Sequence, residues 1–215
     1  MTLRFDVRKR LREFTLDAAA DLPAGVTLLE GPSGAGKTTL LLLIAGLAVP
    51  DGGRIALGER VLADAATRTF VPPAARNVAL VFQEYALFPH LDVAANVGYG
   101  LRARSVPAAE RALRVRRALD RFEIAELAGA RVNELSGGQR QRVALARALV
   151  VEPAALLIDE PLAALDPATR DRVRGELAAM LADIGVPAVF VSHDPSDRAH
   201  FGARTLRLER GELAR

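Results

Sequence analysis

The chain has 215 residues, of which 50% are hydrophobic and 26% are charged. This composition is typical of a folded protein with one sizeable core and excludes an intrinsically disordered chain. There is no cysteine, which excludes disulfides and thiolate-bound metals and fits a reducing compartment. The N-terminus has no apolar signal run, and apolar runs such as residues 40–45 and 154–158 are far too short to cross a bilayer. We therefore expect any membrane span to belong to other chains.

The net charge of +3 comes from 29 basic and 26 acidic residues. A basic chain can indicate nucleic-acid binding. Here the cations are spread along the chain and no basic run alternates with aromatic residues, so we expect no nucleic-acid partner. Nearly all the cations are arginines, and the only lysines are Lys9 and Lys37. Lys37 lies in a glycine-rich segment, where a compact ammonium fits between phosphate oxygens and a planar guanidinium does not.

The first 86 residues predict short strands around one helix. Apolar residues alternate over residues 3–7 and 14–16, on either side of a basic turn at residues 8–10, which predicts a hairpin. Proline and glycine at residues 50–53 are expected to end the helix that follows the glycine-rich turn. The other expected elements are strands at residues 26–30, 54–57 and 78–82 and that helix at residues 37–47.

Residues 87–135 differ because helical patterns replace the strands. Turn residues at Pro89, Gly98, Gly100 and Pro107 are expected to break these helices. Residues 108–127 predict an amphipathic helix. Its apolar and basic faces are made by Ala112, Val115, Leu119 and Phe122 and by Arg111, Arg114, Arg117 and Arg121. A solvated surface is the simpler interpretation of the arginines. Contact with anionic lipid headgroups is the alternative.

The last third of the chain returns to alternation between strands and helices. Strands are expected at residues 154–158, 187–192 and 205–208, with a helix at residues 167–183. This alternation predicts a parallel sheet covered on both faces. We therefore expect an α/β core formed by residues 1–86 and 136–215, with a helical lobe inserted at about residues 87–135.

Residues 31–38 match the pattern G-x-x-x-x-G-K-[ST] in full, between a predicted strand and a predicted helix. The glycines let successive N–H groups point inward, and the helix start adds its positive dipole end. Lys37 would reach the outer phosphates of a nucleotide, and the Thr38 hydroxyl would ligate Mg²⁺. An incidental glycine turn is the alternative, which the strand–loop–helix setting disfavours. The predicted binding residues are Gly31, Pro32, Ser33, Gly34, Ala35, Gly36, Lys37, Thr38 and Thr39.

Two acids follow the apolar strand at residues 154–158. Carboxylates at the C-terminal edge of a parallel strand lie where ligands bind in such sheets. Asp159 would hold Mg²⁺, directly or through water, and Glu160 would orient or deprotonate an attacking water. Solvated acids at a strand end are the alternative, which the phosphate loop makes the weaker interpretation.

Leu-Ser-Gly-Gly-Gln at residues 135–139 opens a further predicted helix. Ser136 and Gln139 match the S-x-x-Q capping box, which is an ordinary way to begin a helix. Capping does not explain Gly137 and Gly138, because consecutive glycines weaken a helix start. They make sense if a ligand approaches the backbone closely, which predicts a second phosphate site formed by these four residues.

Two further polar residues follow predicted strands. The amide oxygen of Gln83 is suited to ligate Mg²⁺ and sense the nucleotide. A neutral His193 at the C-terminal edge of a central strand is suited to contact a γ-phosphate. The alternative for both is an ordinary polar residue at a strand end. His90 and His200 have no comparable setting and are interpreted as surface residues.

Taken in order, these segments resemble the nucleotide-binding subunits of ABC transporters. The resemblance covers nearly the whole chain, and Leu-Ser-Gly-Gly-Gln-Arg-Gln-Arg at residues 135–142 is its most specific part. It implies one ABC ATPase domain over residues 1–215, with an α/β P-loop NTPase (RecA-like) core and a mainly parallel sheet. A small N-terminal antiparallel β hairpin subdomain and an inserted helical lobe complete that fold.

The resemblance also implies ATP with Mg²⁺, bound between two copies that form a head-to-tail homodimer. Each ATP would lie between the Lys37 loop of one copy and the Ser136 segment of the other. The implied catalytic residues are Glu160 as base, His193 at the γ-phosphate and Lys37, and the implied metal ligands are Thr38, Gln83 and Asp159. Leu165-Asp166 resembles the D-loop, although Ala163 replaces its usual serine, and Asp166-Pro167 also reads as a plain helix start.

Residues 81–93 are similar to importers of ions and small solutes. In that group this segment helps to form a groove for a permease helix, which makes Leu87, Phe88 and Pro89 candidate anchors. Their packing inside the lobe is the alternative. The importer resemblance implies permease subunits, an external solute-binding protein and a peripheral location at the cytoplasmic face of the membrane. A non-transport ATPase acting on nucleic acid or ribosomes, and an exporter ATPase, are the other readings.

The N-terminal part looks closest to molybdate-transport ATPases, through its short hairpin, Leu22-Pro-Ala-Gly, Gly-Ala-Gly-Lys and residues 60–64. Two departures qualify this. Most of the superfamily has an adenine-stacking aromatic about two dozen residues before the loop, where this chain has a basic turn at residues 8–10. Molybdate-type ATPases usually carry a C-terminal regulatory domain, and this sequence stops at Arg215. Sulfate, phosphonate, iron and polyamine remain open as solutes.

Overall fold

The computed structural model describes residues 1–162, 167–182, 184–201 and 204–214. They form two compact units. The first unit comprises Met1–Leu80, Ala154–Glu160 and Arg174–Arg215, and the second comprises Val81–Pro153 and Pro161–Val173. Leu165 and Asp166, predicted as a D-loop, and Ala163 lie outside the described residues.

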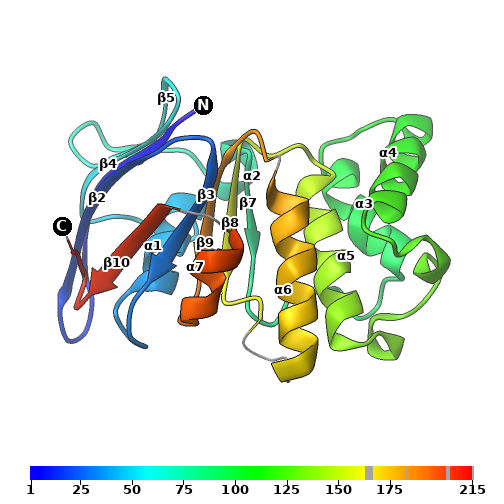
Figure 1. Ribbon diagram of the computed structural model, residues 1–215. Helices are drawn as coiled ribbons and strands as arrows, with labels where there is room; N and C mark the ends of the chain where they lie inside the picture. Colours follow the sequence, from blue (N-terminus) through cyan, green and yellow to red (C-terminus); the bar gives the residue numbers. More distant parts are fainter. Residues whose placement is uncertain (163–166, 183, 202–203, 215) are drawn as a thin grey trace. The chain divides into compact units, whose positions relative to one another are not determined.

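Within the described residues, the first unit is built on one mixed sheet of eleven strands. The strands are β1 (Leu3–Arg10), β2 (Thr15–Leu22), β3 (Gly25–Glu30), β4 (Gly52–Leu57), β5 (Arg60–Asp64), β6 (Thr69–Phe70), β7 (Val78–Val81), β8 (Ala155–Asp159), β9 (Pro187–Val191), β10 (Arg204–Glu209) and β11 (Glu212–Leu213). Their order in the sheet is β6-β5-β4-β1-β2-β11-β10-β3-β9-β8-β7. Strands far apart in the sequence therefore lie side by side, as β10 and β3 do in Figure 1.

The antiparallel part of the sheet contains the predicted N-terminal hairpin. β1 pairs with β2 over its whole length, and alternate side chains are buried, as the two-residue period of a strand requires. The turn predicted at residues 8–10 is wrong, because these residues belong to β1 and the turn lies at residues 11–14. The basic residues fit a strand here because Arg8 faces Asp17 across the ladder, with 2.9 Å between Nε and Oδ2.

The parallel part of the sheet confirms the prediction from strand–helix alternation. β10, β3, β9 and β8 are successively parallel neighbours. All residues of β8 and β9 are buried, which explains their unbroken apolar sequence. Leu29 of β3 and Asp159 of β8 both lie beside Val191 of β9. The carboxyl ends of three strands thus meet at one edge of the sheet, and the residues that follow them are neighbours.

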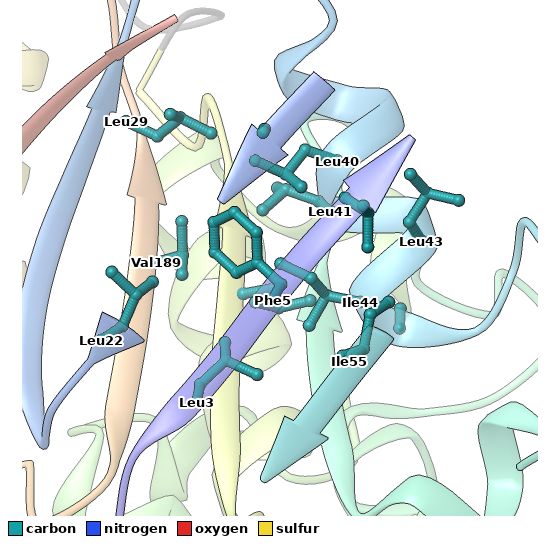
Figure 2. Packing of buried hydrophobic residues seen from close by; sticks show 14 of the residues in the cluster. Leu3, Phe5, Leu22, Leu29, Leu40, Leu41, Leu43, Ile44, Ile55 and Val189 are labelled. Carbon is teal, nitrogen blue, oxygen red and sulfur yellow. The ribbon is translucent and has the colours of Figure 1, made fainter. Parts of the chain in front are cut away.

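The helix that follows β3, α1 (Lys37–Ala45), supplies much of the core of this unit. Its leucine and isoleucine side chains pack with residues from several strands in one hydrophobic cluster. Figure 2 shows them as Leu40, Leu41, Leu43 and Ile44, together with Leu3, Phe5, Leu22, Leu29, Ile55 and Val189. This packing anchors the helix, and with it the loop that precedes the helix.

The end of α1 differs from the prediction. The helix ends at Gly46, whose φ of 82° is left-handed, and does not continue to residue 47. The N–H of Gly46 bonds back to the carbonyls of the last turn, and the short helix α2 (Pro73–Arg76) adds a second contact through Arg76, whose side chain is fully buried. Its Nη1 donates to the carbonyls of Leu43 and Ile44, each at 2.8 Å. A distant arginine therefore satisfies the helix end, and a Cβ at residue 46 would lie 2.4 Å from its Nε.

The second unit is helical, and it is larger than the lobe expected at about residues 87–135, because it also includes residues 81–86, 136–153 and 161–173. Its helices are α3 (Val93–Ala103), α4 (Ala108–Arg121), α5 (Gly137–Leu149) and the 3-10 turns η1 (Ala125–Leu127) and η2 (Val132–Glu134). Gly98 and Gly100 were expected to break a helix, but both lie within α3. A Cβ at Gly98 would approach Val115 to 3.1 Å, and one at Gly100 would approach Val151 to 2.7 Å. These glycines therefore serve close packing.

Helix α4 confirms the amphipathic pattern with two changes. Leu119 and Phe122 are buried, but Ala112 is exposed and the helix ends at Arg121. Arg114 pairs with Glu110 and lies 3.5 Å from Glu152. In the part of the chain that the structure describes, no helix combines the length and apolar character needed to span a bilayer.

Two more helices follow the strands of the last third. Helix α6 (Pro167–Ala182) begins in the second unit and ends in the first. Helix α7 (Pro195–Phe201), which was not predicted, packs on β9 through Phe190 and Phe201, whose ring centroids are 4.5 Å apart. Helix α7 begins two residues after His193.

Candidate functional site

The loop between β3 and α1 curls through three glycines with positive φ. Gly31, Gly34 and Gly36 have φ of 149°, 79° and 103°. Gly31 has a further reason for lacking a side chain, because a Cβ there would lie 2.1 Å from the carbonyl oxygen of Leu208 in β10. Gly34 faces open space. Pro32 and Ser33 are exposed, Ala35 is buried and Thr39 is half-buried.

Lys37 turns back over this loop. Its side chain is only 6% exposed, and Nζ donates to the carbonyls of Gly31 at 2.9 Å and Pro32 at 3.0 Å. Nζ also lies 3.8 Å from Oε1 of Glu160. A single ammonium is thus held at the inner face of the loop, where it would meet an anion bound by the backbone N–H groups.

Asp159 ends β8 and is buried close to α1. Burial raises the pKa of its carboxyl group, and the charge of Glu160 acts in the same direction, while a hydrogen bond from Thr38 and the charge of Lys37 act against this. The Thr38 hydroxyl and the Asp159 carboxylate are therefore adjacent. Both are oxygen ligands of the kind that Mg²⁺ prefers, and the raised pKa indicates a carboxylate that lacks full compensation for burial.

Glu160 lies between the side chains of Lys37 and His193 at the strand edge. Its backbone φ is 42°, in the left-handed region that few non-glycine residues adopt. Its Oε2 lies 3.7 Å from Nδ1 of His193, and its Oε1 faces Lys37. The side chain of His193 is 63% exposed. The predicted site residues of the first unit thus come together at one sheet edge. They are Lys37, Thr38, Asp159, Glu160 and His193.

The other predicted site residues lie in the second unit. Gln83 is exposed just after β7. Ser136 caps α5 with a complete capping box, because its Oγ accepts from the N–H of Gln139 and its own N–H donates to Oε1 of Gln139 at 2.8 Å. The capping interpretation is therefore confirmed as local structure. Gly138 has room for a Cβ, whose nearest neighbour would be Val173 at 3.6 Å.

The segment after Gln83 is fixed from within its own unit. Tyr85 and Ala86 have positive φ of 62° and 45°. Arg147 of α5 donates to their carbonyls at 2.7 Å and 2.8 Å. The same guanidinium lies 5.3 Å from the ring of Phe88, which also packs on Tyr99. Phe88 is half-buried and its ring packs on residues of its own lobe, while Leu87 is also half-buried and Pro89 is exposed.

One residue near the loop was missed from sequence. Phe14, at the end of the hairpin turn, lies 3.6 Å from the position of a Cβ on Gly36 and also packs against Gly211. It was overlooked because the turn was placed on residues 8–10, where no aromatic occurs. The alternation over residues 14–16 placed Phe14 in a strand, whereas β2 begins one residue later at Thr15 and leaves Phe14 at the end of the turn.

Metal sites made by side chains alone are not found among the residues that the structure describes, since no group of three or more His, Asp or Glu side chains gathers there. Mg²⁺ commonly uses one or two protein oxygens together with phosphates and water. Thr38 and Asp159 suit that arrangement.

Comparison with known proteins gives consistent results. The family model described as ABC transporter matches residues 18–163. The chain is 45% identical to the trehalose/maltose import ATP-binding protein MalK of Thermococcus litoralis, over 86% of this chain and 50% of that protein. It is 50% identical to the spermidine/putrescine import ATP-binding protein PotA of Frankia alni, over 86% and 38%. It is 40% identical to the molybdenum import ATP-binding protein ModC of Paramagnetospirillum magneticum, over 99% and 58%.

The strand–loop–helix around Lys37 and the parallel strands beside it define a P-loop NTPase fold. The chain belongs to the ABC transporter family. It spans about half the length of the curated relatives that it matches.

Proposed function

We propose that this chain is the ATP-hydrolysing nucleotide-binding subunit of an ABC importer. The observation that carries the proposal is the meeting of Lys37, Asp159 and Glu160 at one sheet edge beside a glycine loop. The relatives with 40% to 50% identity are import ATP-binding proteins by name.

The loop and Lys37 are assigned to the phosphates of ATP. The first N–H groups of α1 have no intrahelical partner, and its N-cap Gly36 offers no side chain to accept from them. These groups, with the dipole of α1, suit an anion. Lys37 would exchange the carbonyls of Gly31 and Pro32 for phosphate oxygens. The predicted ligands at this loop are Gly31, Pro32, Ser33, Gly34, Ala35, Gly36, Lys37, Thr38 and Thr39.

Thr38 and Asp159, with Gln83, are assigned to Mg²⁺. When bound, the ion neutralises negative charge on the phosphates. The raised pKa of Asp159 supports this role, because a nearby cation would stabilise the buried carboxylate.

Glu160 is assigned as the base for hydrolysis. Its carboxylate would accept a proton from water as the water oxygen bonds to the γ-phosphorus and the bond to the bridging oxygen breaks. His193, which lies next to Glu160, would donate to the γ-phosphate. Lys37 would stabilise the charge on the departing phosphate.

A second copy is assigned to the other side of the nucleotide. In this head-to-tail homodimer, the start of α5 would supply Ser136, Gly137, Gly138 and Gln139. The paired glycines support this assignment, since the Ser136–Gln139 capping box accounts for the helix start without them.

Phe14 is assigned as the aromatic contact of adenine, because its ring lies against Gly36.

Permease subunits and an external solute-binding protein would complete the importer, with this chain bound at the cytoplasmic face of the membrane. Pro89 and the half-buried Leu87 are the proposed contacts of a permease helix.

We further propose molybdate or another oxyanion as solute. The match to the molybdenum relative covers 99% of this chain and supports this, although the spermidine/putrescine relative is more identical at 50%.

The replacement Glu160→Gln tests the function. We expect ATP to bind with parent affinity, hydrolysis to fall by about 100-fold or more, and an ATP-bound dimer to accumulate. Size-exclusion chromatography with ATP and a phosphate-release assay measure these results. The matched control is Glu126→Gln, a change at an exposed acid, which should hydrolyse ATP as the parent does. Hydrolysis by Glu160→Gln at the parent rate would show that the base is another residue.

Co-purification tests the importer assignment. A polytopic membrane protein should be recovered with the chain, and replacing Pro89 and Leu87 by aspartate should release it. Recovery of nucleic acid or ribosomes in its place would contradict the importer assignment. Uptake of labelled molybdate, sulfate and spermidine by the reconstituted complex then tests the solute.

A further inference from the structure

A buried ion pair lies behind the exposed His193. Arg174 of α6 and Asp197 of α7 both have side chains that are 2% exposed, and Nε of Arg174 donates to Oδ1 of Asp197 at 2.5 Å. The same guanidinium pairs with the carboxylate of Asp194. All of these residues belong to the first unit.

The pair is connected to both neighbours of His193. The hydroxyl of Ser192 donates to Oδ2 of Asp197. The N–H of Asp194 donates to the oxygen of the same hydroxyl at 3.0 Å. The residues before and after His193 are therefore tied to one buried network.

The network also ties this loop to the sheet and to α7. The N–H of Ser192 donates to the carbonyl of Leu29 in β3 at 3.3 Å. The carboxylate of Asp194 accepts from the N–H of Ser196 at 2.9 Å. The backbone on both sides of His193 is thus held, while its imidazole stays exposed and 3.7 Å from Glu160.

Stability alone is a poor explanation for such a network. Burying two charges costs desolvation, and apolar residues of similar volume often stabilise a core as well or better. A buried ionic network is better suited to define one geometry, because only one arrangement satisfies all of its partners. Here the arrangement that satisfies Arg174 and Asp197 also sets the backbone of residues 192–194.

We propose that Arg174 and Asp197 are positioning residues for His193, holding its imidazole in reach of Glu160 and of the γ-phosphate. The inference rests on the proposed role of His193 in ATP hydrolysis. The two residues act through His193 and do not touch the nucleotide.

A double-mutant cycle tests this inference. In the parent background, Asp197→Asn should lower kcat by about 10-fold and leave the KM for ATP unchanged, because a small misplacement of a catalytic group is costly. In the His193→Ala background, the same change should lower kcat by less than about 2-fold, because no imidazole is left to position. Arg174→Lys should behave in the same way.

Ser192→Ala is a milder variant, since it removes the connecting hydroxyl and keeps the ion pair. We expect it to lower kcat by about 3-fold, again only when His193 is present. The control is Asp17→Asn, which breaks the exposed pair with Arg8 and should leave kcat unchanged. Circular dichroism and the urea midpoint check that each variant is folded. If Asp197→Asn does not fold, the positioning role is tested with Ser192→Ala instead.

The outcomes separate the two proposals. If His193→Ala lowers kcat but Asp197→Asn and Ser192→Ala lower it equally with and without His193, the positioning role is wrong and the proposed function stands. If His193→Ala hydrolyses ATP at the parent rate, the assignment of His193 is wrong, and the positioning role with it.

Discussion

Two helix starts, one in each unit, use glycine in opposite ways. Helix α1 begins at Gly36, whose φ of 103° excludes most side chains and which offers no side-chain cap. Helix α5 begins at Ser136 with a complete capping box, and two glycines follow in ordinary helical positions. The first start has no side chain that accepts from its N–H groups, while at the second the Ser136 hydroxyl accepts from the N–H of Gln139. The backbone therefore requires glycine at position 36, while Gly138 has room for a Cβ.

This difference separates a motif whose glycines are explained by contacts in its own unit from a motif whose glycines are not. The loop at Gly31 to Lys37 is accounted for by its own unit, through strand β10, the carbonyls that meet the ammonium and the neighbouring acids. The start of α5 has a complete capping box, and Gly138 has room for a Cβ, so the packing around Gly138 does not require glycine. We infer that the reason for Gly137 and Gly138 is a molecule that approaches from outside. Three substitutions separate these explanations.

The largest effect is expected at Gly31. In Gly31→Ala the new Cβ would lie 2.1 Å from the carbonyl oxygen of Leu208, at a φ of 149°. We expect the free energy of unfolding of the first unit to fall by about 3 kcal/mol, from backbone strain and overpacking together. Gly34→Ala is the matched control, because its Cβ would face open space and only the φ of 79° is unfavourable. It should cost about 1 kcal/mol. Urea unfolding measures both, and equal losses would show that β10 does not constrain the loop.

A smaller effect on stability is expected at Ser136. Ser136→Ala removes the side-chain acceptor for the N–H of Gln139 and should cost about 1 kcal/mol. If a phosphate also meets this hydroxyl, ATP hydrolysis should fall by about 10-fold or more in a variant that remains folded. Ser136→Thr keeps the hydroxyl and should preserve both properties. Hydrolysis of ATP by Ser136→Ala at the parent rate would show that Ser136 caps the helix and has no role at a phosphate.

The smallest effect on stability, with the opposite sign, is expected at Gly138. Gly138→Ala adds a Cβ in ordinary contact with Val173 and favours the helix by up to about 1 kcal/mol. The variant should therefore unfold at the same or higher urea concentration, yet hydrolyse ATP about 10-fold more slowly if a second copy approaches this backbone. Gly129→Ala, with open space around its Cβ, should leave hydrolysis unchanged. A fully active Gly138→Ala would remove the argument for that approach.

The sequence predicted best the features that local pattern decides. The buried runs of β8 and β9 and the strand–loop–helix around Lys37 were found because their apolar runs and glycines are contiguous. The end of α1 was misplaced because the glycine cap at Gly46 was passed over, and the contact of Arg76 with the last carbonyls comes from a residue thirty positions away (76 − 46 = 30). Gly98 was read as a helix break because its packing against α4 cannot be seen from α3 alone.

Within the candidate site, the polar side chains that could act on a ligand were easier to predict than the residues and short elements that surround them. Lys37 stands out through its glycine-rich motif, and Asp159, Glu160 and His193 stand out because each ends or follows an apolar strand. Phe14 was missed because the hairpin turn was placed three residues too early. Short elements such as β6, β11 and α7 carry too few residues for a periodic signal, and they exist because longer neighbours pair or pack with them.

The contact between Gly31 and Leu208 also has a consequence for how the chain folds during synthesis. The loop between β3 and α1 is synthesised early, and β10, which packs against it, is synthesised near the end of the described sequence. A nascent chain therefore carries this loop without its final packing partner until β10 has left the ribosome. If nucleotide binds this loop, it would stabilise the folded state only of chains that already contain β10.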